Sequence, residues 1–213
     1  MSNQPISRWQ SLVAFISIAK ISSFIKVSLI LGHYTAYFSA INMVMPVAGA
    51  WCGLTGSTVV AAVGFLMRFA VYGSALPLHM LSYHIPGLFG AYYFATRSGF
   101  IRLAVPLACM GFFLLHPVGF QAWEYTMYWW IPVIIYALDR KSLWLDALGS
   151  TFVVHAVGSV IWIYTTESTV SMWLSLMPIV ALERLVFMIG IVAFQRILLW
   201  ISNNVIIPRT HTA

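Results

Sequence analysis

The charged residues of this chain stand so far apart that long apolar intervals separate them. Only 8% of the 213 residues are charged and 61% are hydrophobic, and the mean hydropathy is +0.89. Soluble domains carry about 25% charged residues. A soluble domain of this length still leaves roughly 30% of its unfolded-chain surface in water. Because so much apolar surface needs lipid as its solvent, the sequence predicts an all-α, polytopic bundle of transmembrane helices in the cell (inner or plasma) membrane.

The apolar intervals give the expected number of crossings, since a helix needs about 20 apolar residues to cross a bilayer. They cover residues 27–45, 47–72, 78–96, 103–138, 143–164 and 172–202. Pro46 separates the first two, and the turn from His116 to Gly119 divides the fourth, because Pro and Gly interrupt helices. Pro86 and Gly87 interrupt 78–96, which we therefore expect to be partly re-entrant. About six crossings result, with seven as the alternative.

Basic residues set the expected orientation, because they concentrate on the cytoplasmic side of membrane proteins. Arg97 with Arg102, Arg140 with Lys141, and Arg209 are separated by two expected crossings each. All of them can therefore be cytoplasmic, and six crossings place both termini there. A seven-helix chain would have its N-terminus outside.

The chain divides into three expected regions. Residues 1–26 form a cytoplasmic or interfacial N-terminal segment, in which 9–26 would be a helix with its lysines at the level of the lipid headgroups. Residues 27–203 form the transmembrane domain, and residues 204–213 form a C-terminal tail.

The sequence lacks the patterns that are typical of several kinds of site. Cys52 and Cys109 lie in apolar stretches, which favours packing over a disulfide or a zinc site. The basic residues are scattered, so the formal charge of +6 does not indicate nucleic-acid binding. No H-E-x-x-H, Cys-x-x-Cys or G-x-S-x-G pattern occurs. We therefore expect no enzyme, no metal site and no cofactor. Haem ligation by a pair among His33, His84, His116 and His155 stays open, without a motif to support it.

One acidic residue lies in an aromatic segment that follows the His116 turn. Glu124 is close in sequence to Trp123, Tyr128 and Trp129. Aromatic rings offer flat contact area and a carboxylate can orient one polar group, so the segment indicates a substrate-binding pocket. An interfacial aromatic belt with an exposed Glu124 is the alternative.

Three ionisable residues lie deep in the last two apolar intervals. Glu183 and Arg184 are adjacent, and adjacent residues point about 100° apart on a helix, so we do not expect them to pair. We expect Arg184 in a cytoplasmic or partner-facing groove and Glu183 inside the bundle, near a substrate. His155 shares a helix face with Gly158 and Ser159, where it can line a cavity; a satisfied core histidine is the alternative.

Pairs of small residues four apart allow helices to approach closely in lipid. Ala36 and Ala40 form such a pair in the first interval, and Gly49 with Gly53 and Gly87 with Ala91 repeat it. Packing within the chain explains them, or the Ala36 face docks a partner subunit.

The order of these features resembles the substrate-binding S component of energy-coupling factor transporters. The Ala36 and Ala40 pair matches the Ala-x-x-x-Ala motif in the first helix of that family, and Pro46 precedes a Gly-rich stretch as in its second helix. Residues 178–196 resemble its last helix, which begins near a Pro and ends with basic residues.

The resemblance implies uptake of a vitamin or another small micronutrient. The chain would bind its substrate in an outward-facing pocket and pair through its first helix with a membrane coupling protein driven by ATPases. It has no G-x-x-x-x-G-K-[ST] motif to supply that energy itself. A stand-alone small permease gated by Glu183 and Arg184, and a non-transporting assembly or cofactor-holding subunit, are the alternatives.

Overall fold

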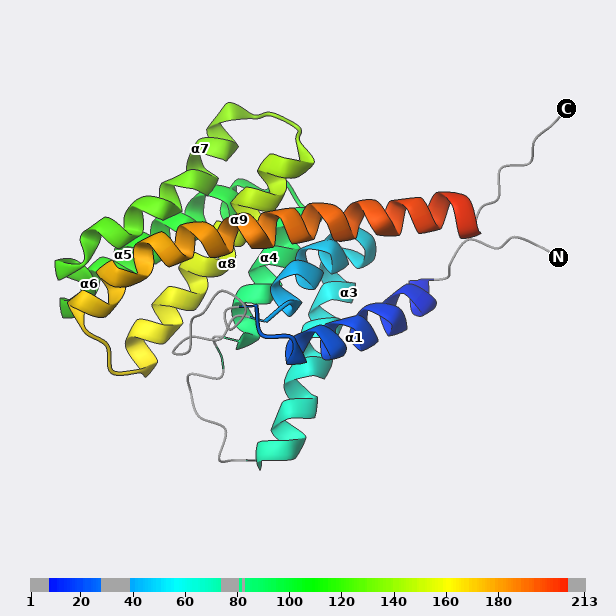
Figure 1. Cartoon of the computed structure of the whole chain (residues 1–213), viewed down its shortest axis with the longest axis horizontal. Coiled ribbons are helices and arrows are strands. Elements are labelled where there is room, and N and C mark those ends of the chain that lie inside the picture. Colours follow the sequence, from blue (N-terminus) through cyan, green and yellow to red (C-terminus); the bar gives the residue numbers. More distant parts are fainter. Residues whose placement is uncertain (1–7, 28–38, 74–80, 82, 207–213) are drawn as a thin grey trace, which may run out of the picture.

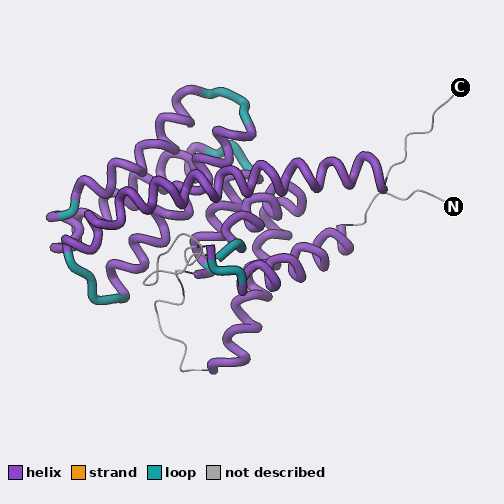
Figure 2. The backbone as a smooth tube through the Cα atoms, in the orientation of Figure 1, coloured by secondary structure: helices purple, strands orange, loops and turns teal. Residues whose placement is uncertain are grey.

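The computed structural model describes residues 8–27, 39–73, 81 and 83–206, and these ranges fold almost entirely into helices (Figures 1 and 2). The α-helices are α1 (Arg8–Phe24), α3 (Ile41–Tyr72), α4 (Ile85–Ala95), α5 (Val105–Leu115), α6 (Pro117–Gln121), α7 (Trp130–Leu138), α8 (Leu143–Thr165) and α9 (Val170–Ile201). Three further helical turns are the π-helices η3 (Phe100–Ala104) and η5 (Ser202–Ile206) and the 3-10 helix η4 (Trp123–Trp129). Strand-type pairing within these ranges is limited to one bridge, between Lys26 and Ser39. The prediction of an all-α fold is confirmed.

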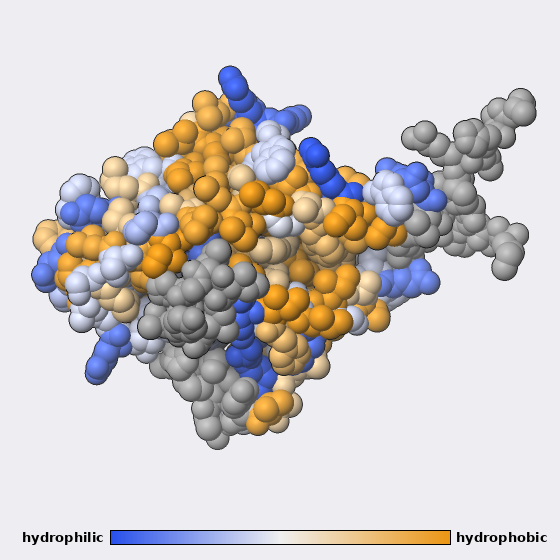
Figure 3. Space-filling view, in the orientation of Figure 1, coloured by the Kyte–Doolittle hydropathy of each residue, from blue (hydrophilic) through white to orange (hydrophobic). Residues whose placement is uncertain are grey.

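Three helical stretches of the described chain are long and apolar enough to cross a membrane. They are Ile41–Val71, Leu143–Thr165 and Val170–Asn204. The last two agree with the intervals 143–164 and 172–202 expected from the sequence. Large apolar side chains also face outward, among them Leu66, Ile134 and Ile189, and apolar residues cover much of the face in Figure 3. These features suit a membrane protein, and the count of six crossings remains a prediction.

The expected break at Pro46 is wrong. Helix α3 begins at Ile41 and continues through Pro46, whose fully buried ring packs against Gly90 of α4. The interruption comes at Gly53, where φ is 67° and ψ is −170°. A positive φ suits glycine because it has no Cβ, whereas one missing N–H near the start of a helix is tolerated when packing compensates. The kink therefore lies seven residues after the predicted one.

The other two expected interruptions have different outcomes. Helix α5 ends at Leu115 and His116 caps α6, so the turn that begins at His116 is confirmed. Pro86 does not interrupt a helix, because α4 starts at Ile85 and Pro86 lies in its first turn, where proline is favoured. Residues 78–80 lie outside the described residues, and the re-entrant segment therefore remains a prediction.

The buried side chains form two cores that share α4, α8 and α9. The aromatic core joins α5, η4, α8 and the first half of α9, and it contains Phe113, Tyr125, Trp129, Phe152 and Trp173. The second core joins α1, α3 and the later part of α9. Helix α8 is central, because its residues 149–159 are buried on every side.

Small residues bring α3 and α4 into backbone contact within the second core. A Cβ on Gly49 would collide with the backbone carbonyl of Ala91. Gly49 and Ala91, which belong to two of the predicted small-residue pairs, therefore pack against each other. For these two residues, packing within the chain is the observed role.

Candidate functional site

A polar cluster around His155 lies inside the aromatic core. His155 is on α8 and is 1% exposed. Its Nε2 lies 2.8 Å from the hydroxyl of Tyr125, and its Nδ1 accepts a hydrogen bond of 3.1 Å from Nε1 of Trp129. Tyr125 and Trp129 are four residues apart in η4 and are 2% and 0% exposed. The hydroxyl of Ser159, one turn after His155, is 3.4 Å from Nε2. We call these four residues the His155 cluster.

The indole of Trp129 fixes the direction of the hydrogen bonds. An indole N–H only donates, so Nδ1 of His155 must be the unprotonated nitrogen. The neutral ring then carries its proton on Nε2, which donates to the hydroxyl oxygen of Tyr125. A second proton on Nδ1 would face the indole N–H, with two donors in contact. The geometry therefore holds His155 neutral, with one tautomer.

Aromatic rings enclose this cluster. Phe113 stacks on Tyr125 with ring centroids 5.7 Å apart, and its edge-on contacts with Trp129 and Trp173 span 5.3 and 5.0 Å. Trp173, from α9, also meets Tyr125 edge-on at 4.8 Å. The rings pack directly around the polar atoms of the cluster, which are hydrogen-bonded to one another.

The charged pair on α9 lies beside the same face of α8. Arg184 is 0% exposed, and its guanidinium donates to the backbone carbonyl of Thr151 at 3.4 Å. Thr151, His155 and Ser159 are four residues apart in turn, so they share one face of α8. Arg184 also packs over the ring of Phe187 at 4.7 Å. The guanidinium is therefore held inside the bundle, next to the face that carries the His155 cluster.

Two expectations for this pair are corrected. Glu183 and Arg184 do form an ion pair, with 3.4 Å between a guanidinium nitrogen and a carboxylate oxygen. The long arginine side chain crosses the angle between adjacent helical positions, which the argument from backbone direction neglected. Arg184 also lies within the bundle and not in a groove on its surface, because a charge in an apolar core needs nearby polar partners.

The predicted pocket around Glu124 does not form one site. Trp123 is 53% exposed, whereas Trp129 is fully buried and bonds to His155. The hydroxyl of Tyr128 donates to the backbone carbonyl of Met177 at 2.9 Å. Glu124 is half-buried, and its Oε2 lacks a hydrogen-bond partner among the described residues. The four side chains therefore have different surroundings and do not line one pocket.

Two members of the His155 cluster were among the predicted substrate-binding residues and two were not, and a substrate-binding role for them remains a prediction. Trp129 and His155 were expected in a substrate site, and the structure brings them together. Tyr125, Ser159 and the arginine contact at Thr151 were not expected. No spacing in the sequence indicated that Tyr125 and Trp129 share a partner, because residues four apart in the 3-10 helix η4 point about 120° apart.

The predicted partner face is only partly visible. Ala36 lies outside the described residues. Ala40 is half-buried just before α3, and its backbone N–H donates to the carbonyl of Ile25 at 2.9 Å. A partner contact at this pair therefore remains a prediction.

Comparisons of the chain with protein-family models, with curated proteins and with solved structures find no match. The chemistry of the His155 cluster is therefore the starting point for assigning a function.

Proposed function

We propose that this protein binds a small solute at the His155 cluster and takes part in moving it across the membrane. The observation that carries the proposal is the directed hydrogen-bond chain from Trp129 through His155 to Tyr125, enclosed by aromatic rings. Buried polar groups are expensive in a membrane protein and usually serve function. The rings suit the flat, partly polar molecules typical of vitamins and related micronutrients.

The ion pair on α9 supports the same proposal. Two charges inside an apolar bundle lower stability unless their geometry compensates for lost hydration. Arg184 contacts the carbonyl of Thr151, on the α8 face that also carries His155. A solute at the His155 cluster would lie beside this guanidinium, which can recognise an acceptor such as a carboxylate or a carbonyl.

Energy for transport would come from another subunit. The sequence contains no G-x-x-x-x-G-K-[ST] motif for binding nucleotide phosphates. We propose that the chain is a substrate-binding subunit, similar to an S component, and that a membrane coupling protein with ATPase subunits drives it. A stand-alone permease, in which Glu183 and Arg184 act in gating, is the second candidate because of their burial.

The test of binding compares two neighbouring tryptophans. Trp129→Phe removes the donor to His155, whereas Trp130→Phe alters an indole that is 44% exposed. The solute is first identified by mass spectrometry of molecules released from protein purified out of its native membrane. Its affinity for each variant is then measured by calorimetry. A lost hydrogen bond of about 1–1.5 kcal/mol predicts affinity about five- to tenfold weaker for Trp129→Phe only. Equal affinities in both variants would reject the site.

A separate measurement tests the subunit proposal. An ATPase module should copurify with the tagged full-length chain under mild solubilisation, and solute uptake should require it. Uptake by the chain alone in vesicles would favour the permease.

A further inference from the structure

An open hollow lies at the end of the bundle where the turn between α5 and α6 meets the connection between α8 and α9 (Figure 1). Its volume is about 450 Å³, and it is lined by His116 and residues 163–168. Sites for small organic molecules usually have volumes of about 300–1,000 Å³. The hollow is therefore large enough to receive a small solute.

The hollow lies along α8 from the His155 cluster. Ile163 lines the hollow, is 2% exposed and also belongs to the aromatic core. His155, Ser159 and Ile163 are four residues apart in turn, so they share one face of α8. The helical rise places Ile163 about 12 Å beyond His155. The hollow and the cluster are therefore successive regions on the same face of this helix.

The indole of Trp173 contacts both regions. Its Nε1 donates to the hydroxyl of Ser168, in the lining of the hollow, at 3.1 Å. Its ring is 2% exposed and meets Tyr125 of the cluster edge-on, with ring centroids 4.8 Å apart. Trp173 lies in the first turn of α9, directly after the non-helical residues 167–169. Helix ends open more readily than helix interiors, so this ring is well placed to move.

The hollow presents one carboxylate and one imidazole. Glu167 is exposed, and its carboxylate is in none of the ion pairs formed among the described residues. Nδ1 of His116 accepts a hydrogen bond of 3.3 Å from the backbone N–H of Val118, so the neutral ring carries its proton on Nε2. The carboxylate is the one negative charge in this lining. It should raise the local concentration of positively charged solutes.

We propose that this hollow is the entrance through which a solute with a positively charged nitrogen reaches the His155 cluster, and that Trp173 is the gate between them. The inference rests on the proposed function, because it concerns access to the same cluster. Rings pack directly around the cluster, so a solute reaches His155 only when one of them moves. Trp173 is the ring that is bonded to the lining of the hollow. Loss of its hydrogen bond to Ser168 should therefore open the gate more often.

The experiment measures chemical access to Ser159, a member of the cluster that is 6% exposed. Ser159→Cys is made in the full-length chain, with Cys52 and Cys109 replaced by alanine. The thiol is labelled with a methanethiosulfonate reagent that carries an ammonium group, and with one that carries a sulfonate. Ser150→Cys is the matched control position, because Ser150 is fully buried on the opposite face of α8 and bonds to the carbonyl of Gly90.

Two alanine variants test the gate in this background. Ser168→Ala removes the acceptor of the Trp173 hydrogen bond. Ser171→Ala is its control, because Ser171 lies near the same connection and its hydroxyl is bonded to that of Thr169. Ser168→Ala should raise the labelling rate of Ser159→Cys about fivefold, since the loss of one hydrogen bond increases the open population by about this factor. Ser171→Ala should leave the rate unchanged.

Glu167→Gln tests the charge preference of the entrance. It should lower the ratio of ammonium to sulfonate labelling at Ser159→Cys about threefold, as expected for an exposed charge, and leave the ratio at Ser150→Cys unchanged. An unchanged ratio at Ser159→Cys would overturn the entrance. No acceleration by Ser168→Ala, or equal acceleration at Ser150→Cys, would overturn the gate. The labelling uses no solute, so its failure is distinguishable from failure of the proposed function, which the affinity of Trp129→Phe tests separately.

Discussion

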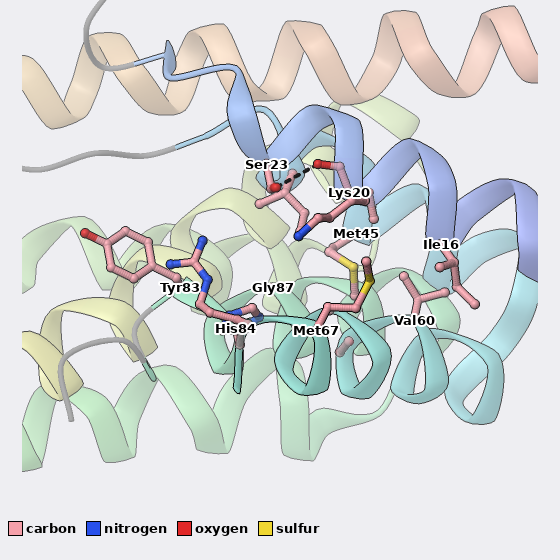
Figure 4. A pocket seen from close by; sticks show the side chains of 14 residues that line it. Ile16, Lys20, Ser23, Met45, Val60, Met67, Tyr83, His84 and Gly87 are labelled. Atoms are coloured by element: carbon pink, nitrogen blue, oxygen red, sulfur yellow. Dashed lines mark hydrogen bonds between the residues drawn. The ribbon is translucent and has the colours of Figure 1, made fainter. Parts of the chain in front are cut away.

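Two groups of basic side chains in this protein differ in the acidic residues that lie beside them. The paired cluster consists of Arg97, Arg102, Asp139 and Asp146, where α4, η3, α7 and α8 meet. The basic cavity is lined by Lys20, Arg68 and His84, and none of its lining residues is acidic. The first group is neutralised within the chain. The second group places Lys20 and Arg68 at the same cavity as His84 (Figure 4).

Ion pairs and hydrogen bonds of the paired cluster connect the ends of neighbouring helices. Arg102 is 4% exposed and donates to Asp146 at 2.7 Å and to the carbonyl of Tyr93 at 2.9 Å. Its guanidinium also lies 4.2 Å from the centre of the Tyr93 ring. Arg97 approaches the other carboxylate oxygen of Asp146 at 3.5 Å but is more exposed. Arg102 thus makes an ion pair, a hydrogen bond to a carbonyl and a cation–π contact, and we expect it to stabilise the fold.

The difference between the two groups lies in the side chains that each cation meets. The chain has five acidic side chains and places two of them at the paired cluster. The comparison can be tested by removing charges from each group.

The largest expected effect is the loss of Arg102. Arg102→Gln removes the partner of Asp146 and leaves its partly buried carboxylate with the weaker Arg97 contact. Breaking a buried ion pair in this way costs about 3–5 kcal/mol. Thermal unfolding in detergent should show a large fall in melting temperature. A melting temperature equal to that of Lys20→Gln would remove the distinction between the groups.

A pH titration should reveal the basic cavity. The pKa of His84 is about 4 in the folded protein, below its ordinary value of 6.5, because of burial and the charges of Arg68 on α3 and Lys20 on α1. The unfolded chain therefore takes up its proton first on acidification. The contribution of the neutral His84 ring to the free energy of unfolding is complete above about pH 6.5, and it is lost as the pH falls toward 4.

This loss in the free energy of unfolding should be limited to about 2 kcal/mol, because solvent reaches part of the His84 ring and screens the charges. His84→Asn provides the control, because it cannot titrate in this range. Unfolding measured between pH 7 and 4 should be less pH-dependent in the variant. Parallel profiles for both proteins would show that His84 is not the titrating group.

A smaller effect of opposite sign is expected for Lys20. Lys20→Gln removes one of the charges that disfavour protonation of His84, so the pKa of His84 should rise. Stability should change by at most about 1 kcal/mol, toward greater stability. Nuclear magnetic resonance titration of labelled histidine reports the pKa directly. An unchanged pKa would mean that Lys20 does not act on the cavity.

The smallest effect is expected for Arg97. Its ion pairs with Asp139 and Asp146 are long, and the Asp139 side chain is 93% exposed. Exposed pairs contribute about 0–1 kcal/mol and are screened by salt. Arg97→Gln should therefore melt close to the wild type, and any difference should shrink in high salt. A loss as large as that of Arg102→Gln would make the paired cluster a single unit.

The long apolar helices could be predicted because their signal is local. The intervals 143–164 and 172–202 agree with α8 and α9 within two residues at either end, since charge and turn residues delimit them. The turn at His116 follows from the same reasoning. Pro46 misled the prediction, because packing against Gly90 keeps the ring inside α3.

The candidate site could be predicted only in part. His155 and Trp129 were recognisable as polar groups in apolar surroundings. Nothing in the sequence indicated that the Trp129 indole meets Nδ1 of His155, or that Glu124 and Trp123 point elsewhere. Those outcomes depend on how η4 packs against α8.

The sequence by itself determined that this chain is helical and suited to lipid, because apolar composition and helix-breaking residues act locally. It also determined that five acidic side chains stand against eleven lysines and arginines. The tertiary structure alone decided which cations receive them. Arg102 meets Asp146 across 44 positions of sequence, and Lys20 and His84, which are 64 positions apart, line the same cavity. Such pairings arise from the packing of whole helices, which balances contacts over all of their faces and cannot be derived from any one segment.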